Sequence, residues 1–345
     1  MPQERLFAGY LLSSLLLAAA VYWVQSRRIP GRCMTLRGFW QFITQGQAYT
    51  HVSARQDYAL FVMNAVLFYA LLAPLLRVEH GVAQRVYQWA LLGWGEPVRH
   101  TAALPWVLAF TVAVVVCVDF AAFFVHWCFH RVPWLWQFHK VHHSAQVLNP
   151  LTLHRIHPLE LAAALLLIEA ASGVVYALFA YWQGTAPMRY SVLGLNALWF
   201  VFYLCGYNLR HSHIWLPFPR GVMRWVLSPA QHQIHHSVAV VHRNKNFGLM
   251  LACWDRCFGT LYVPKQQESL QFGLAGELTN VPVRCSLLTS VWTLYWQPFR
   301  WTWRECHKRW RCFTHWPASN KQYAEAPDMA ATTQRECVSA RVDNA

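Results

Sequence analysis

The sequence predicts an all-α integral membrane helical bundle of about five spans, with a cytosolic histidine-rich helical cap. Three observations lead to this fold class. Apolar residues make up 56% of the 345-residue chain and charged residues only 13%, which is about half the charged share of a soluble domain. Long apolar stretches recur along the chain, and many of its 18 histidines are clustered. The 19 Trp and 14 Tyr residues are typical of aromatic belts at membrane surfaces.

Five apolar stretches are long enough to cross a bilayer, which takes about 20 helical residues. The predicted spans cover residues 6–24, 58–76, 104–125, 159–182 and 190–207. The first stretch precedes Arg27 and Arg28 without a convincing small-residue cleavage site, so we expect an uncleaved anchor rather than a signal peptide. Residues 82–92 could form an amphipathic helix on the membrane surface.

Lys and Arg residues predict the orientation, because they gather on the cytosolic side of a membrane. Five Arg residues lie between the first two predicted spans, whereas Arg189 stands alone in the turn between the last two. We therefore expect the N-terminus outside and the C-terminus in the cytosol. We expect the membrane to be the inner membrane of a bacterium rather than an endoplasmic reticulum. The net charge is +14, and the charged residues are grouped beside apolar spans. This placement favours anionic lipid over nucleic acid as their counterpart.

The chain divides into three regions by composition. Residues 1–100 form an N-terminal transmembrane and connecting region, residues 101–265 hold the histidine clusters, and residues 266–345 contain an interfacial helix and a polar C-terminal tail. The partly apolar residues 283–299 predict the interfacial helix. Ten scattered cysteines without a C-x-x-C pair favour reduced thiols over a disulfide framework.

Three histidine clusters carry the chemical signal. Their spacings, i, i+4 in the first and i, i+3, i+4 in the other two, put imidazoles on one face of a helix. The members are His126 and His130, then His139, His142 and His143, and then His232, His235 and His236. A lone histidine is most simply a hydrogen-bonded core residue, but eight are costly to bury together unless a metal orders them.

The number of clustered imidazoles favours two metal ions. The first cluster lacks the Glu of the H-E-x-x-H protease motif, and a structural zinc site needs only four ligands. Imidazole nitrogen suits iron, zinc, copper and nickel. The first two clusters follow the cytosolic end of the third predicted span, and the hairpin of spans four and five returns the chain to that face. All three clusters are therefore expected at one membrane surface.

These motifs resemble the fatty acid hydroxylase/sterol desaturase superfamily of membrane di-iron enzymes. The resemblance runs from about residue 119 to residue 264 and includes the three histidine boxes, residues 155–160 after the second box, and residues 254–260. It implies that the eight box histidines bind two iron ions. Many members have a further histidine after the last span, which implies His211 as a ninth ligand. His213, two positions later, could compete with it.

Two residues outside the boxes could support the ligands. Asp119 lies about two turns before His126 on the same helical face and could accept a hydrogen bond from a ligand N–H. It could equally be an interfacial aspartate. His157 precedes Pro158 and could either hold a ligand or begin the next helix.

The resemblance implies an O2-dependent oxidoreductase with a cytosolic active site. Its two irons and two external electrons would hydroxylate or desaturate an unactivated C–H bond of a lipid, fatty acyl or sterol substrate. The alternative is a membrane metal-binding or transport protein without redox catalysis. Transporters usually hold ions near the membrane midplane, whereas the boxes lie at or beyond the ends of the spans, which favours the enzyme.

The electrons are expected from outside the chain. The sequence has no dinucleotide fingerprint after a strand, no haem-attachment motif and no iron–sulfur spacing. A ferredoxin or a b-type cytochrome with its reductase could donate them. Basic residues after the fifth predicted span could steer an acidic donor, although they could also be a topology signal; they are Arg210, Arg220, Arg224, Arg243 and Lys245.

Overall fold

The computed structural model describes residues 5–29, 33–100, 103–274 and 286–314. The chain divides into two compact units, residues 1–302 and 303–345, and every site residue discussed below belongs to the first. Helices dominate the described residues. The only strands among them are β1 (Ser191–Val192) and β2 (Leu195–Asn196), which pair antiparallel. The predicted all-α fold class is confirmed.

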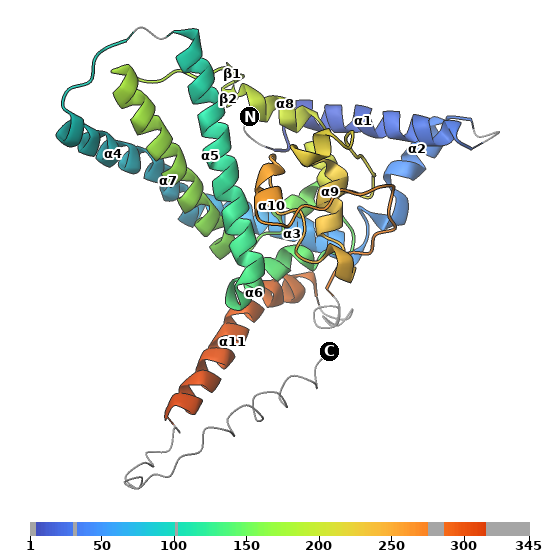
Figure 1. Cartoon of the computed structure of the whole chain (residues 1–345). Helices are drawn as coiled ribbons and strands as arrows, with labels where there is room; N and C mark the ends of the chain where they lie inside the picture. The colour runs from blue at the N-terminus through green and yellow to red at the C-terminus, as the bar shows by residue number, and fades with distance from the viewer. Residues whose placement is uncertain (1–4, 30–32, 101–102, 275–285, 315–345) are drawn as a thin grey trace, which may run out of the picture. The chain divides into compact units, whose positions relative to one another are not determined.

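Eleven α-helices are present in the described residues (Figure 1). They are α1 (Ala8–Arg27), α2 (Leu36–Ile43), α3 (Val52–Leu67), α4 (Val78–Trp94), α5 (Leu104–Arg131), α6 (Pro133–His143), α7 (Pro158–Gln183), α8 (Ala197–Leu204), α9 (Pro229–His235), α10 (Cys253–Cys257) and α11 (Leu287–Thr314). Two of the short 3-10 turns matter for the site, η4 (Pro150–His154) and η5 (Tyr207–His211). The seven cysteines whose side chains are described are free.

Four stretches of the described chain are long and apolar enough to span a membrane. They are α1, the continuous helical stretch Val52–Trp94, α5 and α7. Between 11% and 39% of the residues in their apolar windows are buried, so most of these side chains face outward, as lipid contact requires. The chain is therefore a membrane protein, and the first four predicted spans coincide with these stretches.

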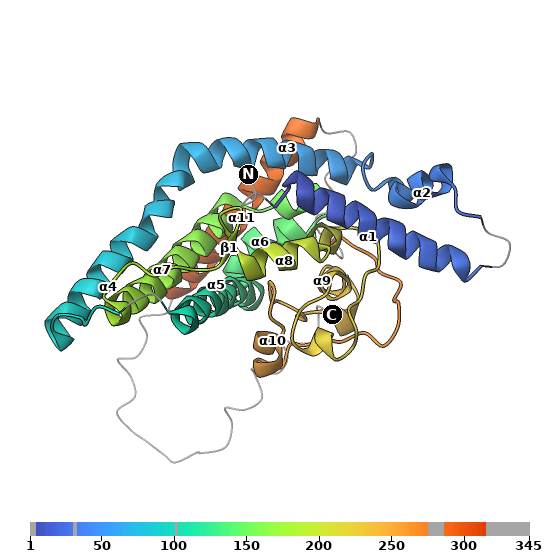
Figure 2. The ribbon, with the colours of Figure 1, turned by 90° about the horizontal axis from the view of Figure 1, so that it is seen from above.

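The second of these stretches changes direction along its length (Figure 2). A π-turn at Phe68–Leu72 and a 3-10 turn at Ala73–Arg77 join α3 to α4, and Pro74 in the second turn lacks the N–H that a regular helix needs. Exposed His80, Gln84 and Gln88 recur at i, i+4 along α4. The same helix also exposes Trp89 and Leu92, at 74% and 86%, so the amphipathic surface helix at residues 82–92 stays a prediction.

The prediction of a fifth span at residues 190–207 is wrong. This region forms the small hairpin, the eight-residue α8 and the start of η5. At 1.5 Å per residue α8 is about 12 Å long, which is too short to cross a bilayer. One side of α8 is buried within the protein instead, where Trp199 and Phe202 pack with Tyr10 and Val115.

Residues 184–211 nevertheless return the chain to the histidine end of α5. Near the start of α5, Thr111 accepts a hydrogen bond from Tyr190 N on its hydroxyl oxygen, and Asn196 Nδ2 donates to its carbonyl. The chain then continues through α8 and η5 to the site. Helix α7 packs against both α4 and α5, and Figure 1 shows α5 running down to α6.

The interfacial helix predicted at residues 283–299 corresponds to the beginning of α11, which starts at Leu287; residues 283–285 lie outside the described chain. Val291 and Leu294 pack against Leu60 and Val141. The opposite side exposes large apolar side chains, among them Trp292 at 63%. One face of α11 thus packs on the helices that support the site.

Candidate metal centre

Four elements bring the clustered histidines to one place. The last turns of α5 carry the first box, α6 carries the second, α9 and its C-cap carry the third, and η5 carries His211. Pro133 occupies the first turn of α6, where its missing N–H costs nothing. Ser228 and Gln231 form a capping box that starts α9.

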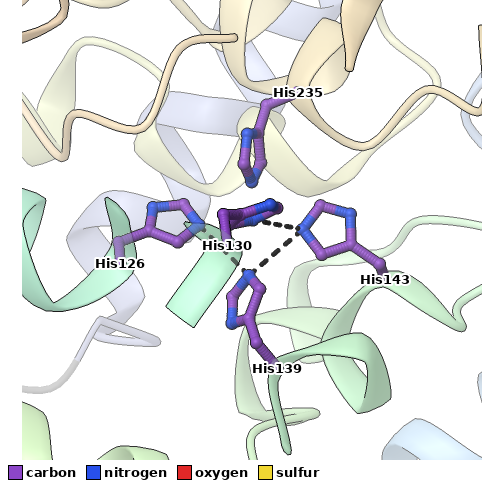
Figure 3. Close-up of side chains that lie close together, drawn as sticks. All are labelled: His126, His130, His139, His143 and His235. Atoms are coloured by element: carbon purple, nitrogen blue, oxygen red, sulfur yellow. Dashed lines mark hydrogen bonds between the residues drawn. The ribbon is translucent and has the colours of Figure 1, made fainter. Parts of the chain in front are cut away.

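The first histidine group consists of five side chains whose ring nitrogens all lie within 4.8 Å of one another. Its members are His126, His130, His139, His143 and His235. Nε2 of His139 lies 3.1 Å from Nε2 of both His126 and His143. Nε2 of His143 lies 3.2 Å from that of His130. Figure 3 shows the five rings pointing at a common centre, with His235 opposite His139.

The second histidine group is His142, His211, His232 and His236, again with ring nitrogens within 4.8 Å of one another. Nε2 of His211 lies 3.3 Å from that of His142, 3.0 Å from that of His232 and 3.1 Å from that of His236. The two groups are adjacent, because the rings of His143 and His236 are 4.7 Å apart between centroids. The structure therefore brings together all eight box histidines and His211.

The geometry of both groups fits metal ions. Nitrogens bound at about 2.0–2.1 Å from one ion lie about 3 Å from each other, which is the spacing found here. Nε2 of His235 is buried and has no hydrogen-bond partner among the described residues. A buried nitrogen without a partner is costly, and a metal ion at the centre of the first group would satisfy it.

Burial also keeps these rings in the form that binds metal. It lowers the pKa of His142, His143, His211, His232 and His236 well below the ordinary 6.5. It lowers the pKa of His235 to about 3. Burial therefore favours the neutral form of these six rings, and a neutral imidazole has one nitrogen lone pair that can bind a metal ion.

Backbone carbonyls orient three of the rings. Nδ1 of His126 donates to Phe247 O at 2.7 Å, and Nδ1 of His235 donates to Lys245 O at 2.8 Å. In the second group, Nδ1 of His142 donates to Arg155 O at 3.3 Å. A proton held on Nδ1 leaves the lone pair of Nε2 directed at the group centre.

His139 has a charged partner, Glu160. Its Nδ1 donates to Glu160 Oε1 at 2.7 Å, and both side chains are buried. Glu160 belongs to residues 155–160 of the family resemblance, but we did not predict its role. An acidic residue in the first turn of a helix is ordinary, because it complements the helix dipole. The contact depends on α7 lying beside α6, an arrangement that no local sequence pattern reveals.

Arg210 is the second charged partner that the sequence did not reveal. The predicted position on a basic cytosolic surface is wrong, because Arg210 is only 2% exposed. It donates from Nη2 to His232 Nδ1 at 2.9 Å and to Gly248 O at 3.1 Å, and from Nη1 to Leu249 O. The second group thus contacts a cation where the first contacts a carboxylate.

Asp119 accepts no hydrogen bond from a histidine among the described residues, which contradicts its predicted role. It accepts from Met250 N at 2.7 Å, Leu251 N at 3.0 Å and Trp254 Nε1 at 2.9 Å. It is also fully buried, so the interfacial alternative is wrong too. Asp119 fixes the segment after Phe247, whose carbonyl holds His126.

Asp255 fixes the beginning of that segment. It accepts from Phe247 N and Gly248 N, both at 2.8 Å. A Cβ on Gly248 would come within 2.6 Å of Leu251 O, so only glycine lets the chain pass this closely. The loop before it has Asn244 and Asn246 in the left-handed region, φ 59° each, which Asn tolerates well.

His157 begins α7. Its Nδ1 accepts from Leu159 N at 3.1 Å, and its Nε2 donates to Tyr295 O at 3.2 Å. Of the two predicted alternatives for His157, the structure therefore shows the second, in which this residue begins a helix and does not hold a ligand. His213 lies outside both groups, since its Nε2 donates to Phe42 O at 2.7 Å.

Arg155 connects the second box to the membrane helices. Its guanidinium donates to Asp57 Oδ1 on α3 and to Val141 O on α6, both at 2.9 Å, while its own carbonyl accepts from His142. Both members of the Arg155–Asp57 pair are buried. No local sequence pattern reveals this pair, because 98 residues separate its members.

A cavity of about 470 Å³ reaches both histidine groups. His130, His143 and His235 line it from the first group and His236 from the second. Small molecules can therefore approach both candidate metal positions from one side.

Comparison with known proteins gives the context of these residues. A model of the fatty acid hydroxylase family matches residues 111–260, which include all nine grouped histidines. The ornithine lipid hydroxylase OlsE of Rhizobium tropici is 26% identical over 176 residues, 51% of this chain and 49% of that protein. Human alkylglycerol monooxygenase is 26% identical over 199 residues, 56% of this chain and 40% of that protein.

A third relative is a cholesterol 25-hydroxylase-like protein of Danio rerio, 28% identical over 184 residues, which are 51% of this chain and 66% of that protein. The chain thus spans about half the length of the first two relatives or less. No solved structure gives a significant match to the chain.

Proposed function

We propose that this chain, whose residues 111–260 belong to the fatty acid hydroxylase family, is a membrane-bound di-iron oxygenase that hydroxylates an unactivated C–H bond of a lipid. The single observation that carries the proposal is the pair of adjacent histidine groups, five and four imidazoles with their nitrogens turned inward. All nine histidines are the proposed ligands. His211 is the proposed ninth ligand, and His213 is not a ligand.

Iron is the metal that suits both the donors and the chemistry. Imidazole binds iron, zinc and copper alike, but zinc has no redox chemistry. The relatives are named as hydroxylases and as a monooxygenase. The two irons, when bound, would supply the electron transfer by which O2 is activated. In the overall reaction, one O2, two electrons and two protons convert C–H to C–OH and release one water.

The chain's own residues would hold the irons. Carbonyls, Glu160 and Arg210 fix the rings, so little reorganisation is needed during the reaction. The ring of Phe247 lies 4.8 Å from that of His130 and 5.6 Å from that of His235, centroid to centroid. This cover closes one side of the first group. Substrate and O2 would approach through the cavity, which Phe247 does not line.

A lipid substrate follows from the setting of the site. The names of the relatives refer to an ornithine lipid, an alkylglycerol and cholesterol. Helix α5 is a candidate span that itself carries the first histidine box, so a lipid need not leave the bilayer entirely. The same names favour hydroxylation over desaturation.

We further propose a separate electron donor, such as a ferredoxin or a b-type cytochrome with its reductase. Arg220, Arg224 and Arg243 are exposed and could attract an acidic donor over a long range. The site is proposed to face the cytosol of a bacterial cell. Without a fifth helical span, the cytosolic position of the C-terminus no longer follows from the span count, whereas the Lys and Arg pattern around the site still favours the cytosol.

The rival function, metal binding or transport without redox catalysis, is less well supported. The grouped histidines lie at one end of α5 and beyond it, not near the middle of a span. Hydrogen bonds hold Nδ1 of five of them, which suits an ion that stays rather than one that passes; the five are His126, His139, His142, His232 and His235.

The test is reconstitution of the purified chain with an electron-donor system, isotope-labelled O2 and a lipid extract. Metal analysis should find about two irons per chain, and mass spectrometry should find one labelled oxygen in a lipid. Full occupancy by zinc, or lipid oxidation that does not need O2, would overturn the proposal.

A further inference from the structure

Asp57 is a buried carboxylate outside both histidine groups and outside the matched residues 111–260. It belongs to α3, in the second candidate span, and it is fully buried. Among the described residues, Asp57 forms an ion pair with Arg155 alone, at 2.9 Å. Apolar side chains of similar volume often stabilise a fold as well as a buried ion pair does, or better. Stability alone is therefore a poor explanation of this pair.

Both oxygens of the Asp57 carboxylate are fixed. Oδ1 accepts from Arg155 Nη1, and Oδ2 accepts from Thr152 Oγ1 at 2.6 Å and from Asn149 Nδ2 at 3.2 Å. Asn149 and Thr152 form the capping box of η4, the turn that ends at Arg155. Asp57 thus holds both this turn and the guanidinium that follows it.

Arg155 reaches the second histidine box in two ways. Its guanidinium donates from Nε to Val141 O at 2.9 Å and from Nη2 to Ser144 Oγ at 2.7 Å. These two residues flank His142 and His143 at the end of α6, where backbone carbonyls lack helical partners and a cation is favourable. The carbonyl of Arg155 also accepts from Nδ1 of His142. One residue therefore fixes both the helix end and the ring of a proposed ligand.

The first histidine group is oriented by other residues. Three of its rings take their Nδ1 partners from Phe247, Glu160 and Lys245. Among the described residues, no ring of that group has a hydrogen bond to Arg155. The support from Arg155 is therefore specific to the second group, where it acts on His142.

We propose that Asp57 is a positioning residue for the second metal position and that it acts through Arg155 on His142. The inference rests on the proposed function, since it concerns the metal centre of that oxygenase. Asp57 neutralises the guanidinium, and the guanidinium places the end of α6 and the Nδ1 partner of His142. A helix of the N-terminal region, which the family match does not include, thereby becomes part of the metal centre.

The alternative is a purely structural role, in which the pair only holds α3 against η4. Loss of Asp57 would then lower stability and weaken metal binding at both positions alike. A selective effect on one position separates the two roles.

The experiment measures the iron affinity of each position separately, by chelator titration of the iron-loaded full chain in nanodiscs. His235→Ala leaves the second group complete, and His236→Ala leaves the first group complete. In the His235→Ala background, Asp57→Asn should weaken binding of the more tightly held iron about tenfold. In the His236→Ala background, the same change should leave the affinity for that iron unchanged.

A variant without either charge is also needed, because Asp57→Asn leaves a buried cation unpaired. Asp57→Leu combined with Arg155→Met should return the free energy of unfolding of the metal-free chain, measured by denaturant titration, to near the wild-type value. The second position should stay weakened about tenfold, because the guanidinium no longer holds Val141 O and Ser144 Oγ.

Thr111→Val is the control for lost stability. It removes the hydroxyl that accepts from Tyr190 N near the start of α5, away from both histidine groups. This variant should be less stable than the wild type, and it should hold both irons with wild-type affinity.

The inference is wrong if Asp57→Asn weakens both positions alike. It is also wrong if the charge-free variant regains wild-type affinity at the second position, or fails to fold, since the pair would then serve the fold alone. Loss of the second iron in Thr111→Val would contradict it as well. Any of these results, with about two irons and O2-dependent lipid oxidation in the wild type, leaves the proposed function standing. A wild-type chain that holds only zinc or oxidises no lipid would overturn the proposed function itself.

Discussion

His139 and Glu160 form a buried pair in which Nδ1 of the ring donates to the carboxylate at 2.7 Å. The other nitrogen of the same ring lies 3.1 Å from Nε2 of both His126 and His143. Glu160 thereby links the first turn of α7 to the centre of the first group and makes His139 a stronger electron donor. In the second group, His232 contacts the guanidinium of Arg210 instead. The two candidate metal positions are thus chemically unequal.

Glu160→Gln should weaken one metal position selectively. The amide can still accept from His139 but has no charge, so metal affinity of the first group should fall about 10- to 100-fold. A chelator titration should then remove one iron much earlier than the other. Glu169→Gln, which removes a carboxylate further along α7, is the control and should keep both irons. If both irons of Glu160→Gln resisted the chelator as well as those of the wild type do, the proposed role of the His139–Glu160 pair would be wrong.

His235→Ala and His236→Ala each remove a proposed ligand, one from each group. Each should abolish activity, and each should lower the iron content of the purified chain from about two towards one. His213→Ala is the matched control, because this ring donates to Phe42 O outside both groups. Its iron content should be that of the wild type. Iron loss in His213→Ala, or full activity of His235→Ala, would show that the ligand set is wrong.

Local patterns were sufficient to predict much of this centre. The spacing of histidines within each box is a property of one helix, so the sequence indicated which rings share a face. The partners of these rings are distant in the chain: Phe247 lies 121 residues after His126, and Arg210 lies 22 residues before His232. No local periodicity reveals such contacts. The apolar run at residues 190–207 led to the wrong prediction of a span for a related reason. Apolar residues are favoured both where a chain packs against protein and where it faces lipid.

Asp119→Ala should destabilise the chain without removing a ligand. It leaves Met250 N, Leu251 N and Trp254 Nε1 without their acceptor, and each unpaired buried donor costs about 1–3 kcal/mol. The free energy of unfolding should therefore fall with and without iron, as measured by denaturant titration in detergent. Chains that remain folded should still bind about two irons. Loss of iron at unchanged apo-protein stability would mean that Asp119 supports a ligand directly.

His157 should make stability depend on pH. Burial lowers the pKa of His157 to about 4, from an unfolded value of about 6.5. Between these values the unfolded chain binds a proton that the folded chain does not, so stability falls as pH falls from 6.5 towards 4. Asn can also accept from Leu159 N and does not titrate. In His157→Asn the free energy of unfolding should therefore fall less than in the wild type between pH 6.5 and pH 4, and the iron should stay bound. Parallel pH profiles of variant and wild type would contradict this.

The side of the membrane that holds the site can be tested at two exposed positions. Val240 is 82% exposed beside the third histidine box, and Leu193 is 63% exposed in the turn between β1 and β2, near the start of α5. After replacement of the exposed native cysteines by serine, Val240→Cys should resist an impermeant thiol reagent applied to intact bacteria. Leu193→Cys should react, because α5 and α7 separate its end of the bundle from the histidines. Permeabilised cells, in which both should react, control for accessibility. Labelling of Val240→Cys from outside would place the site on the other face, and a cytosolic electron donor could then not reach it.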